Sequence, residues 1–163
     1  MTPHGNLKVA ARGDLEIEMK RVFNTSRSLL FDALTRPELV KRWMYGPEGH
    51  SLPVCEIDLT VGGALRYVWR LPDGTEMGMT GRYLEIVRPE RIVHTELFDE
   101  DWTGGETLVT TELYEQGETT LLEMTVRYPS LEARDRVIES GMSEGVAMGY
   151  DRLDVLLPTI AVT

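Results

Sequence analysis

Two residues in the second half of the chain carry side chains suited to acid–base chemistry. His94 and Glu96 are two positions apart in a predicted strand, so both side chains lie on one face of it. If this face is the inner one, an imidazole and a carboxylate project into an apolar interior, where such groups can transfer protons. If Val93, Thr95 and Leu97 are the buried set instead, both residues belong to the surface. The alternation alone leaves both interpretations open.

Other signatures of catalysis are missing from the sequence. There is no Gly-x-Ser-x-Gly elbow, no glycine-rich phosphate loop and no cysteine–histidine cluster at zinc-binding spacing. The histidines, His4, His50 and His94, are far apart in the chain. We therefore expect no metal and no cofactor, and the sequence favours a non-enzymatic protein without deciding the question, with His94 and Glu96 as the only catalytic candidates.

A second group of residues is suited to holding a small molecule. Leu65, Tyr67 and Trp69 alternate with Arg66 and Arg70, so the aromatic side chains are predicted to face inward. Tyrosine and tryptophan present an apolar ring with a hydrogen-bonding edge, which suits a ring-bearing ligand. Plain core packing is the competing interpretation of the same stripe.

Two further features have both a structural and a functional interpretation. Gly141, Gly145 and Gly149 are four residues apart in a predicted helix, where each glycine costs about 1 kcal/mol relative to alanine. Close packing explains this spacing, and room for a ligand is the alternative. The acidic run 99–101 with Trp102 is interpreted as a solvated hairpin tip, which could instead gate a cavity mouth or meet a basic partner.

The elements that position these residues follow from hydrophobic periodicity. Alternation predicts a strand over residues 15–20, and Asn24–Ser26 supply N-cap chemistry for the first of two short helices, which end at Gly46. Six further strands are predicted at 52–59, 64–71, 77–87, 92–98, 107–115 and 119–128. One long amphipathic helix is predicted over 130–157, ended by Pro158. Residues 1–13 have no periodicity and are expected to be a flexible leader before a single domain at 14–160.

This order predicts an α+β helix-grip fold. A seven-stranded, curved antiparallel sheet wraps round the long C-terminal helix, with two short helices after the first strand. The reason is that a long amphipathic helix needs a broad apolar surface, and the inner face of the sheet is the available one.

The composition limits the possible partners. The chain has 163 residues, 42% of them hydrophobic and 27% charged, which is typical of one globular domain. Its net charge of −10 disfavours nucleic acid and anionic membranes as partners. Cys55, the single cysteine, cannot form an internal disulfide, and no signal peptide or apolar membrane span is present. We therefore expect a cytoplasmic protein.

Four blocks of sequence carry a resemblance to a known family. They are LLFDALTRPELVKRWMYGPEG at 29–49, EIDLTVGGALRYVW at 56–69, GRYLEIVRPERIVHTELF at 81–98 and SGMSEGVAMGYDRLDVLL at 140–157. In this order they resemble the SRPBCC, or START-like, superfamily of birch-pollen-allergen-like proteins. Within it, the chain is similar to homologues of the C-terminal domain of the heat-shock-protein-90 ATPase activator. Members often have a second tryptophan at Met44 and another at Val146, so the chain departs from the pattern there.

The predicted faces and the resemblance together imply a ligand site. The expected ligand-binding residues are Trp43, Tyr67, Trp69, Met79, Phe98, Met142 and Val146. We expect a non-enzymatic protein that encloses a small hydrophobic or aromatic molecule between the sheet and the C-terminal helix. The family relationship implies one alternative, a chaperone-interaction module acting in the stress response, and self-association is a further expectation. A cyclase-like enzyme that uses His94 and Glu96 is the other alternative.

Overall fold

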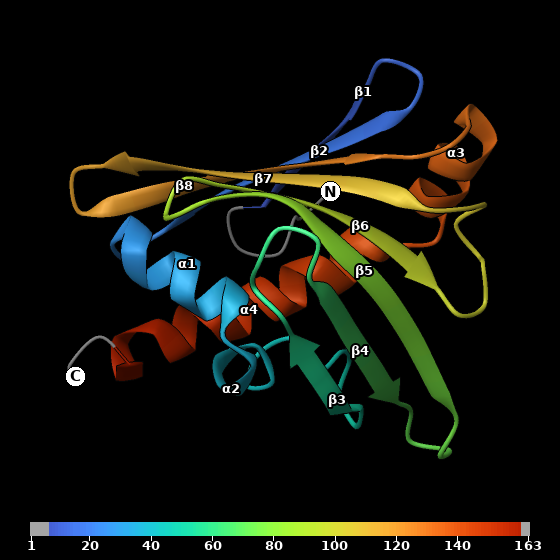
Figure 1. Cartoon of the computed structure of the whole chain (residues 1–163), viewed down its shortest axis with the longest axis horizontal. Helices are drawn as coiled ribbons and strands as arrows, with labels where there is room; N and C mark the ends of the chain where they lie inside the picture. The colour runs from blue at the N-terminus through green and yellow to red at the C-terminus, as the bar shows by residue number, and fades with distance from the viewer. Residues whose placement is uncertain (1–6, 161–163) are drawn as a thin grey trace.

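The computed structural model describes residues 7–160, which form one antiparallel sheet and four helices (Figure 1). The strands are β1 (Lys8–Arg12), β2 (Glu16–Phe23), β3 (Ser51–Ile57), β4 (Ala64–Arg70), β5 (Glu76–Val87), β6 (Arg91–Phe98), β7 (Thr107–Gln116) and β8 (Thr119–Arg127). The helices are α1 (Arg27–Thr35), α2 (Pro37–Val40), α3 (Leu131–Glu139) and α4 (Met142–Ile160). The strand order across the sheet is β1-β2-β8-β7-β6-β5-β4-β3.

The predicted helix-grip architecture is confirmed, with eight strands in place of the expected seven. The additional strand is β1, which pairs with β2 from Lys8↔Lys20 to Arg12↔Glu16. The expectation of a flexible leader is therefore wrong for residues 8–12, and the part at 1–6 lies outside the described residues. All five side chains of β1 are exposed, so the strand forms through backbone pairing and leaves no hydrophobic period in the sequence.

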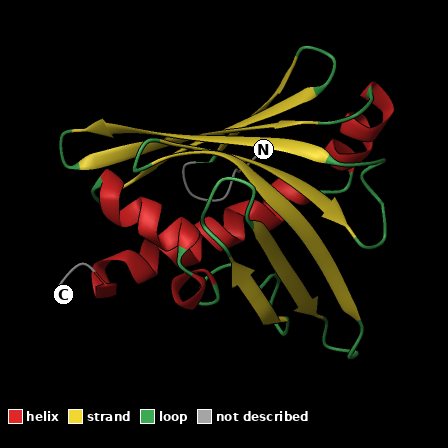
Figure 2. Ribbon diagram, viewed as in Figure 1, coloured by secondary structure: helices red, strands yellow, loops and turns green. Residues whose placement is uncertain are grey.

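The helices α1, α2 and α4 lie on the concave side of the sheet, and β3, β4 and β5 bend round α4 (Figure 2). β5 approaches β6 closely at Gly81, where a Cβ atom would overlap the carbonyl oxygen of Thr95 on β6. A register irregularity between Tyr83 and Glu85 follows in the same strand. This curvature brings the inner face of β4 and β5 toward α4.

The predicted C-terminal helix is two helices. Gly141 has φ +79° and separates α3 from α4, a left-handed conformation that glycine adopts without a Cβ clash. Pro158 lies inside α4, which continues to Ile160, so it does not end the helix as predicted. Because it is in the last turn, its missing N–H removes little of the helical hydrogen bonding.

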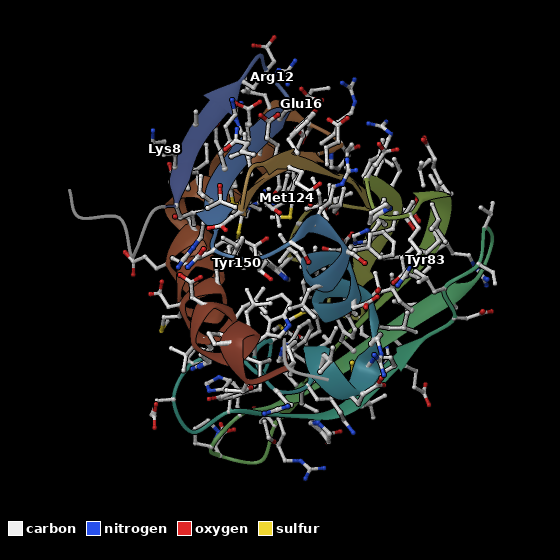
Figure 3. The ribbon with its side chains drawn as sticks, turned by 90° about the vertical axis from the view of Figure 1, so that its left-hand side faces the viewer. Lys8, Arg12, Glu16, Tyr83, Met124 and Tyr150 are labelled. Atoms are coloured by element: carbon white, nitrogen blue, oxygen red, sulfur yellow. The ribbon has the colours of Figure 1, made fainter. Side chains whose placement is uncertain are left out.

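α4 presents one apolar face to the sheet. Ala147, Tyr150, Leu153 and Leu157 are at most 5% exposed and follow helical spacing, whereas Val155 on the opposite face is 76% exposed. Figure 3 shows Tyr150 of α4 and Met124 of β8 facing each other across the interior, where the tyrosine hydroxyl donates to the methionine sulfur at 3.9 Å. Within residues 7–160, no helix has both the length and the apolar character needed to cross a membrane.

Candidate functional site

His94 and Glu96 are on the inner face of the sheet. His94 pairs with Tyr83 on β5 and with Val109 on β7, and directly paired residues point to the same face. Tyr83 and Val109 belong to the core cluster, at 3% and 2% exposure, whereas on the other face of β6 Val93 is buried but lies outside that cluster and Leu97 is 41% exposed. The neighbouring strands therefore decide between the two interpretations that the alternation left open.

The two side chains form a hydrogen-bonded pair. Nε2 of His94 lies 2.9 Å from Oε2 of Glu96, and the side chains are 15% and 28% exposed. The other ring nitrogen of His94, Nδ1, is buried and has no hydrogen-bond partner within residues 7–160. The imidazole therefore has one nitrogen committed to a carboxylate and one buried nitrogen without a partner in the described chain.

Three buried tyrosines belong to the same inner wall, Tyr67 on β4, Tyr83 on β5 and Tyr128 after β8. The ring of Tyr83 lies 5.9 Å from that of His94. Burial chiefly, and in addition the negative charge of Glu96, raise the pKa of all three phenols. The phenols therefore keep their protons at neutral pH and can donate hydrogen bonds.

Next to this polar group, four aromatic rings form a continuous row from β4 to the loop between β6 and β7. Tyr67 and Trp69 are 5.7 Å apart between ring centroids, Trp69 and Phe98 are 6.3 Å apart, and Phe98 and Trp102 are 5.5 Å apart. Nε1 of Trp69 donates to the Met44 carbonyl at 2.8 Å, whereas Nε1 of Trp102 is buried without a partner in the described chain. The row thus combines apolar ring faces with one unused N–H donor.

Residues 99–101 are exposed, as expected of a solvated hairpin tip, but Trp102 departs from that expectation. Trp102 is half-buried and packs against Phe98. On the outer face, Arg66 makes two 2.7 Å hydrogen bonds to Asp99, and the Asp99 amide donates to the Gly78 carbonyl at 2.9 Å. These contacts attach the start of the loop to the sheet, so Trp102 turns back over the inner wall while its acidic neighbours stay outside.

The residues predicted to bind a ligand all belong to, or pack against, one hydrophobic core cluster. Tyr67, Trp69, Met79 and Phe98 lie together on the inner face of β4–β6, as the pairs Tyr67↔Met79 and Met79↔Phe98 require. Met142 and Val146 are half-buried on α4. Their role in ligand binding stays a prediction.

Within this core cluster, Trp43 packs against α1 and α4. Its Nε1 donates to the Ala33 carbonyl at 2.9 Å, and its ring packs 5.8 Å from Tyr150. Gly149 also lies against Trp43, since a Cβ atom there would be 3.5 Å from the indole. Close packing therefore explains Gly149, whereas Gly141 breaks the helix and Gly145 faces open space, so the three glycines do not share one purpose.

Sequence reasoning did not include Tyr83, Tyr128 or Tyr150 in the site. The inward alternation of Tyr83 in the segment 81–87 was available as a signal, but Tyr128 lies just after β8 and Tyr150 is one of several apolar residues on a helix. An open depression of about 250 Å³ occurs elsewhere, near the start of α1 and the turn between β5 and β6. Its lining includes Arg27, Glu90 and Arg91 and none of the predicted ligand-binding residues.

A curved antiparallel sheet that closes on a C-terminal helix, with an inner wall of aromatic side chains, defines an α+β protein of the helix-grip class. Residues 24–158 match the family described as Activator of Hsp90 ATPase homolog 1-like protein, and the chain belongs to this family. The predicted relationship is thereby confirmed. No curated protein matches the chain.

Several solved structures have the same fold. A crystal structure of a protein from Rhodobacter sphaeroides is 36% identical, with a TM-score of 0.90 and coverage of 95% of this chain and 99% of that one. A protein from Nitrosomonas europaea is 23% identical, with a TM-score of 0.82 and coverage of 94% and 100%. CalU16 from Micromonospora echinospora is 22% identical, with a TM-score of 0.61 and coverage of 93% and 83%. The last two similarities show the fold alone.

Proposed function

We propose that this protein is a non-enzymatic binding protein that holds a small hydrophobic or aromatic molecule between the inner face of the sheet and α4. The observation that supports this is the row formed by Trp69, Phe98 and Trp102. Trp69 and Phe98 are stacked and Trp102 packs against Phe98 at a tilt, yet all three rings remain only half-buried, beside core residues such as Tyr67 and Met79 that are at most 6% exposed.

Apolar surface left partly exposed on the inner side of a sheet is typical of a ligand site. Two residues of α4 support the same proposal, because Met142 and Val146 pack against the same core cluster and are also half-buried. Methionine has a flexible, polarizable side chain that adapts to different ligand shapes. A ring inserted between the row and the start of α4 would bury apolar surface on both sides.

The proposal is tested first by native mass spectrometry of the purified protein, which detects a retained apolar ligand as added mass. A second test titrates the ligand-free protein with N-phenyl-1-naphthylamine, whose fluorescence increases in apolar surroundings. We expect saturable binding that the Phe98→Ala variant weakens about tenfold or more, because the variant removes a ring of the row.

Leu97→Ala is the matched control. Leu97 is the adjacent residue on the opposite face of β6 and is 41% exposed, so its truncation leaves the inner wall intact. Equal affinity of the Phe98→Ala and Leu97→Ala variants, or no saturable binding by the unmodified protein, would contradict the proposal.

The family membership supports a second candidate, a chaperone-interaction module of the Hsp90 ATPase activator type, acting in the stress response. Its test is the ATPase rate of Hsp90 from the same organism with and without this protein. An increase that persists in the Phe98→Ala variant would favour this candidate over ligand binding.

The free thiol of buried Cys55 supports the cytoplasm as the expected setting. Self-association is tested by sedimentation of the purified protein.

A further inference from the structure

The interior pair of His94 and Glu96 indicates the chemistry of the ligand, and this inference rests on the proposed function. We propose that the ligand is a neutral ring compound with a hydroxyl or N–H group that donates a hydrogen bond to Nδ1 of His94. The juxtaposition that supports this is an imidazole on the inner wall with Nε2 bonded to a carboxylate and Nδ1 buried without a partner in the described chain.

The carboxylate determines which ring nitrogen carries the hydrogen. An ionised carboxylate only accepts hydrogen bonds. At 2.9 Å from Oε2 of Glu96, Nε2 of His94 is therefore the donor, and in the neutral ring Nδ1 keeps its lone pair. A buried acceptor without a partner is costly, so the site is complementary to a ligand that supplies a donor.

The charges of the interior disfavour an anionic ligand. Glu96 already places a carboxylate on the inner wall. The charges of the two buried arginines within residues 7–160 are already compensated, because Arg21 donates from both Nη atoms to two aspartates of α4, with its Nε left unpartnered, and Arg134 donates to Asp135 and backbone carbonyls. A ligand carboxylate or phosphate would therefore be desolvated without a buried cation beside it, which is strongly unfavourable.

The apolar part of the ligand has a separate place. Phe98 is on the same face of β6 as His94, four residues further on, which is roughly 13 Å along a strand. Phe98 stacks with Trp69 and packs at a tilt against Trp102, so ring contacts and the hydrogen-bond acceptor lie at different points of one inner wall. This separation suits a molecule with an aromatic body and a polar group at one end.

The test compares three compounds that differ at one position of a common scaffold, 2-naphthol, 2-methylnaphthalene and 2-naphthoate. Binding is measured by displacement of N-phenyl-1-naphthylamine at pH 7.5. We expect 2-naphthol to bind about five- to tenfold more tightly than 2-methylnaphthalene, the ratio that one net hydrogen bond supplies. We expect 2-naphthoate to bind most weakly.

Two variants test whether the pair of His94 and Glu96 causes the preference for 2-naphthol over 2-methylnaphthalene. His94→Phe removes the acceptor, so the preference for 2-naphthol is lost while 2-methylnaphthalene still binds. Glu96→Gln keeps the size of the side chain but removes its charge, so the affinity for 2-naphthoate increases and the preference for 2-naphthol decreases. Leu97→Ala again serves as the control and leaves all three affinities unchanged.

The outcomes separate this inference from the proposed function. If the unmodified protein binds 2-naphthol and 2-methylnaphthalene equally well, or if both variants keep the unmodified preference, the inference is overturned while the binding function stands. If neither the fluorescent probe nor any of the three compounds binds, the proposed function fails and the inference fails with it.

Discussion

The attachment of α4 to the sheet depends on a buried arginine whose neutralisation should destabilise the protein. Arg21 of β2 is on the inner face with a side chain 2% exposed, and its two Nη atoms each donate at 2.7 Å, to Asp151 and to Asp154 of α4. Its guanidinium also lies 5.2 Å from the ring centroid of Phe23. The perturbation is the double substitution Asp151→Asn with Asp154→Asn, which removes both negative charges and preserves side-chain size.

The expected loss of folding free energy follows from the different exposure of Arg21 and its two aspartate partners. Asp151 and Asp154 are 42% and 37% exposed, so their own desolvation is modest, whereas Arg21 would remain charged and buried. Leaving a buried charge without its partner costs about 3–5 kcal/mol. Since the asparagine oxygens still accept hydrogen bonds, we expect the lower end, about 3 kcal/mol. For a domain of this size that is roughly 6–12 °C in melting temperature.

The comparison variant is Arg21→Met in the presence of both aspartates. It removes the buried charge and leaves two carboxylates that can hydrate, so we expect a loss below about 1.5 kcal/mol. The triple variant, Arg21→Met with both asparagines, should recover most of the stability that the double variant loses. Urea unfolding curves give the free energies of all four proteins, and their slopes reveal any change in the exposed surface.

Two results would contradict this prediction: a double asparagine variant as stable as the unmodified protein, or an Arg21→Met variant less stable than the double asparagine variant. Either result would mean that Arg21 is not effectively buried between β2 and α4. The same variants report on the site, because α4 carries Met142 and Val146. We expect the double asparagine variant to bind N-phenyl-1-naphthylamine more weakly.

Three further predictions concern other parts of the molecule. Gly81→Ala should lower the free energy of unfolding by about 2 kcal/mol or more, because its Cβ would overlap the Thr95 carbonyl; an unchanged melting temperature would contradict this. Burial raises the pKa of Cys55 to about 11, so only about one thiol in a thousand is ionised at pH 8. The reaction of this thiol with a disulfide reagent should therefore be slow in the folded protein and fast in urea. Equal rates in the two conditions would contradict this prediction. The hydrogen bonds from Arg66 lower the pKa of Asp99 in the folded protein. Their contribution to folding stability is therefore complete above the usual aspartate pKa of about 3.9 and is lost as the pH falls through the lower pKa of the folded state. Below pH 4 the fluorescence of Trp102 should change in the unmodified protein, and Arg66→Ala should show that change already at neutral pH.

Much of the fold follows from local patterns in the sequence. Ser26 accepts a hydrogen bond from the Leu29 amide at the start of α1, as its N-cap chemistry predicts. The alternation of Tyr67 and Trp69 with arginines predicts their common inner face, which the pairing with β5 then fixes. These features depend on residues within a few positions of one another, so the sequence alone determines them.

Other features depend on which segments meet in three dimensions. β1 exists because β2 offers it a backbone edge, and its exposed side chains leave no pattern. Trp102 turns inward because Arg66, thirty-three residues before Asp99, attaches the start of its loop to the sheet. The face of His94 is decided by Tyr83 and Val109 on the neighbouring strands. A two-residue alternation determines that His94 and Glu96 share a face, whereas only the tertiary structure determines that this face is the inner one, because burial depends on what packs against the strand.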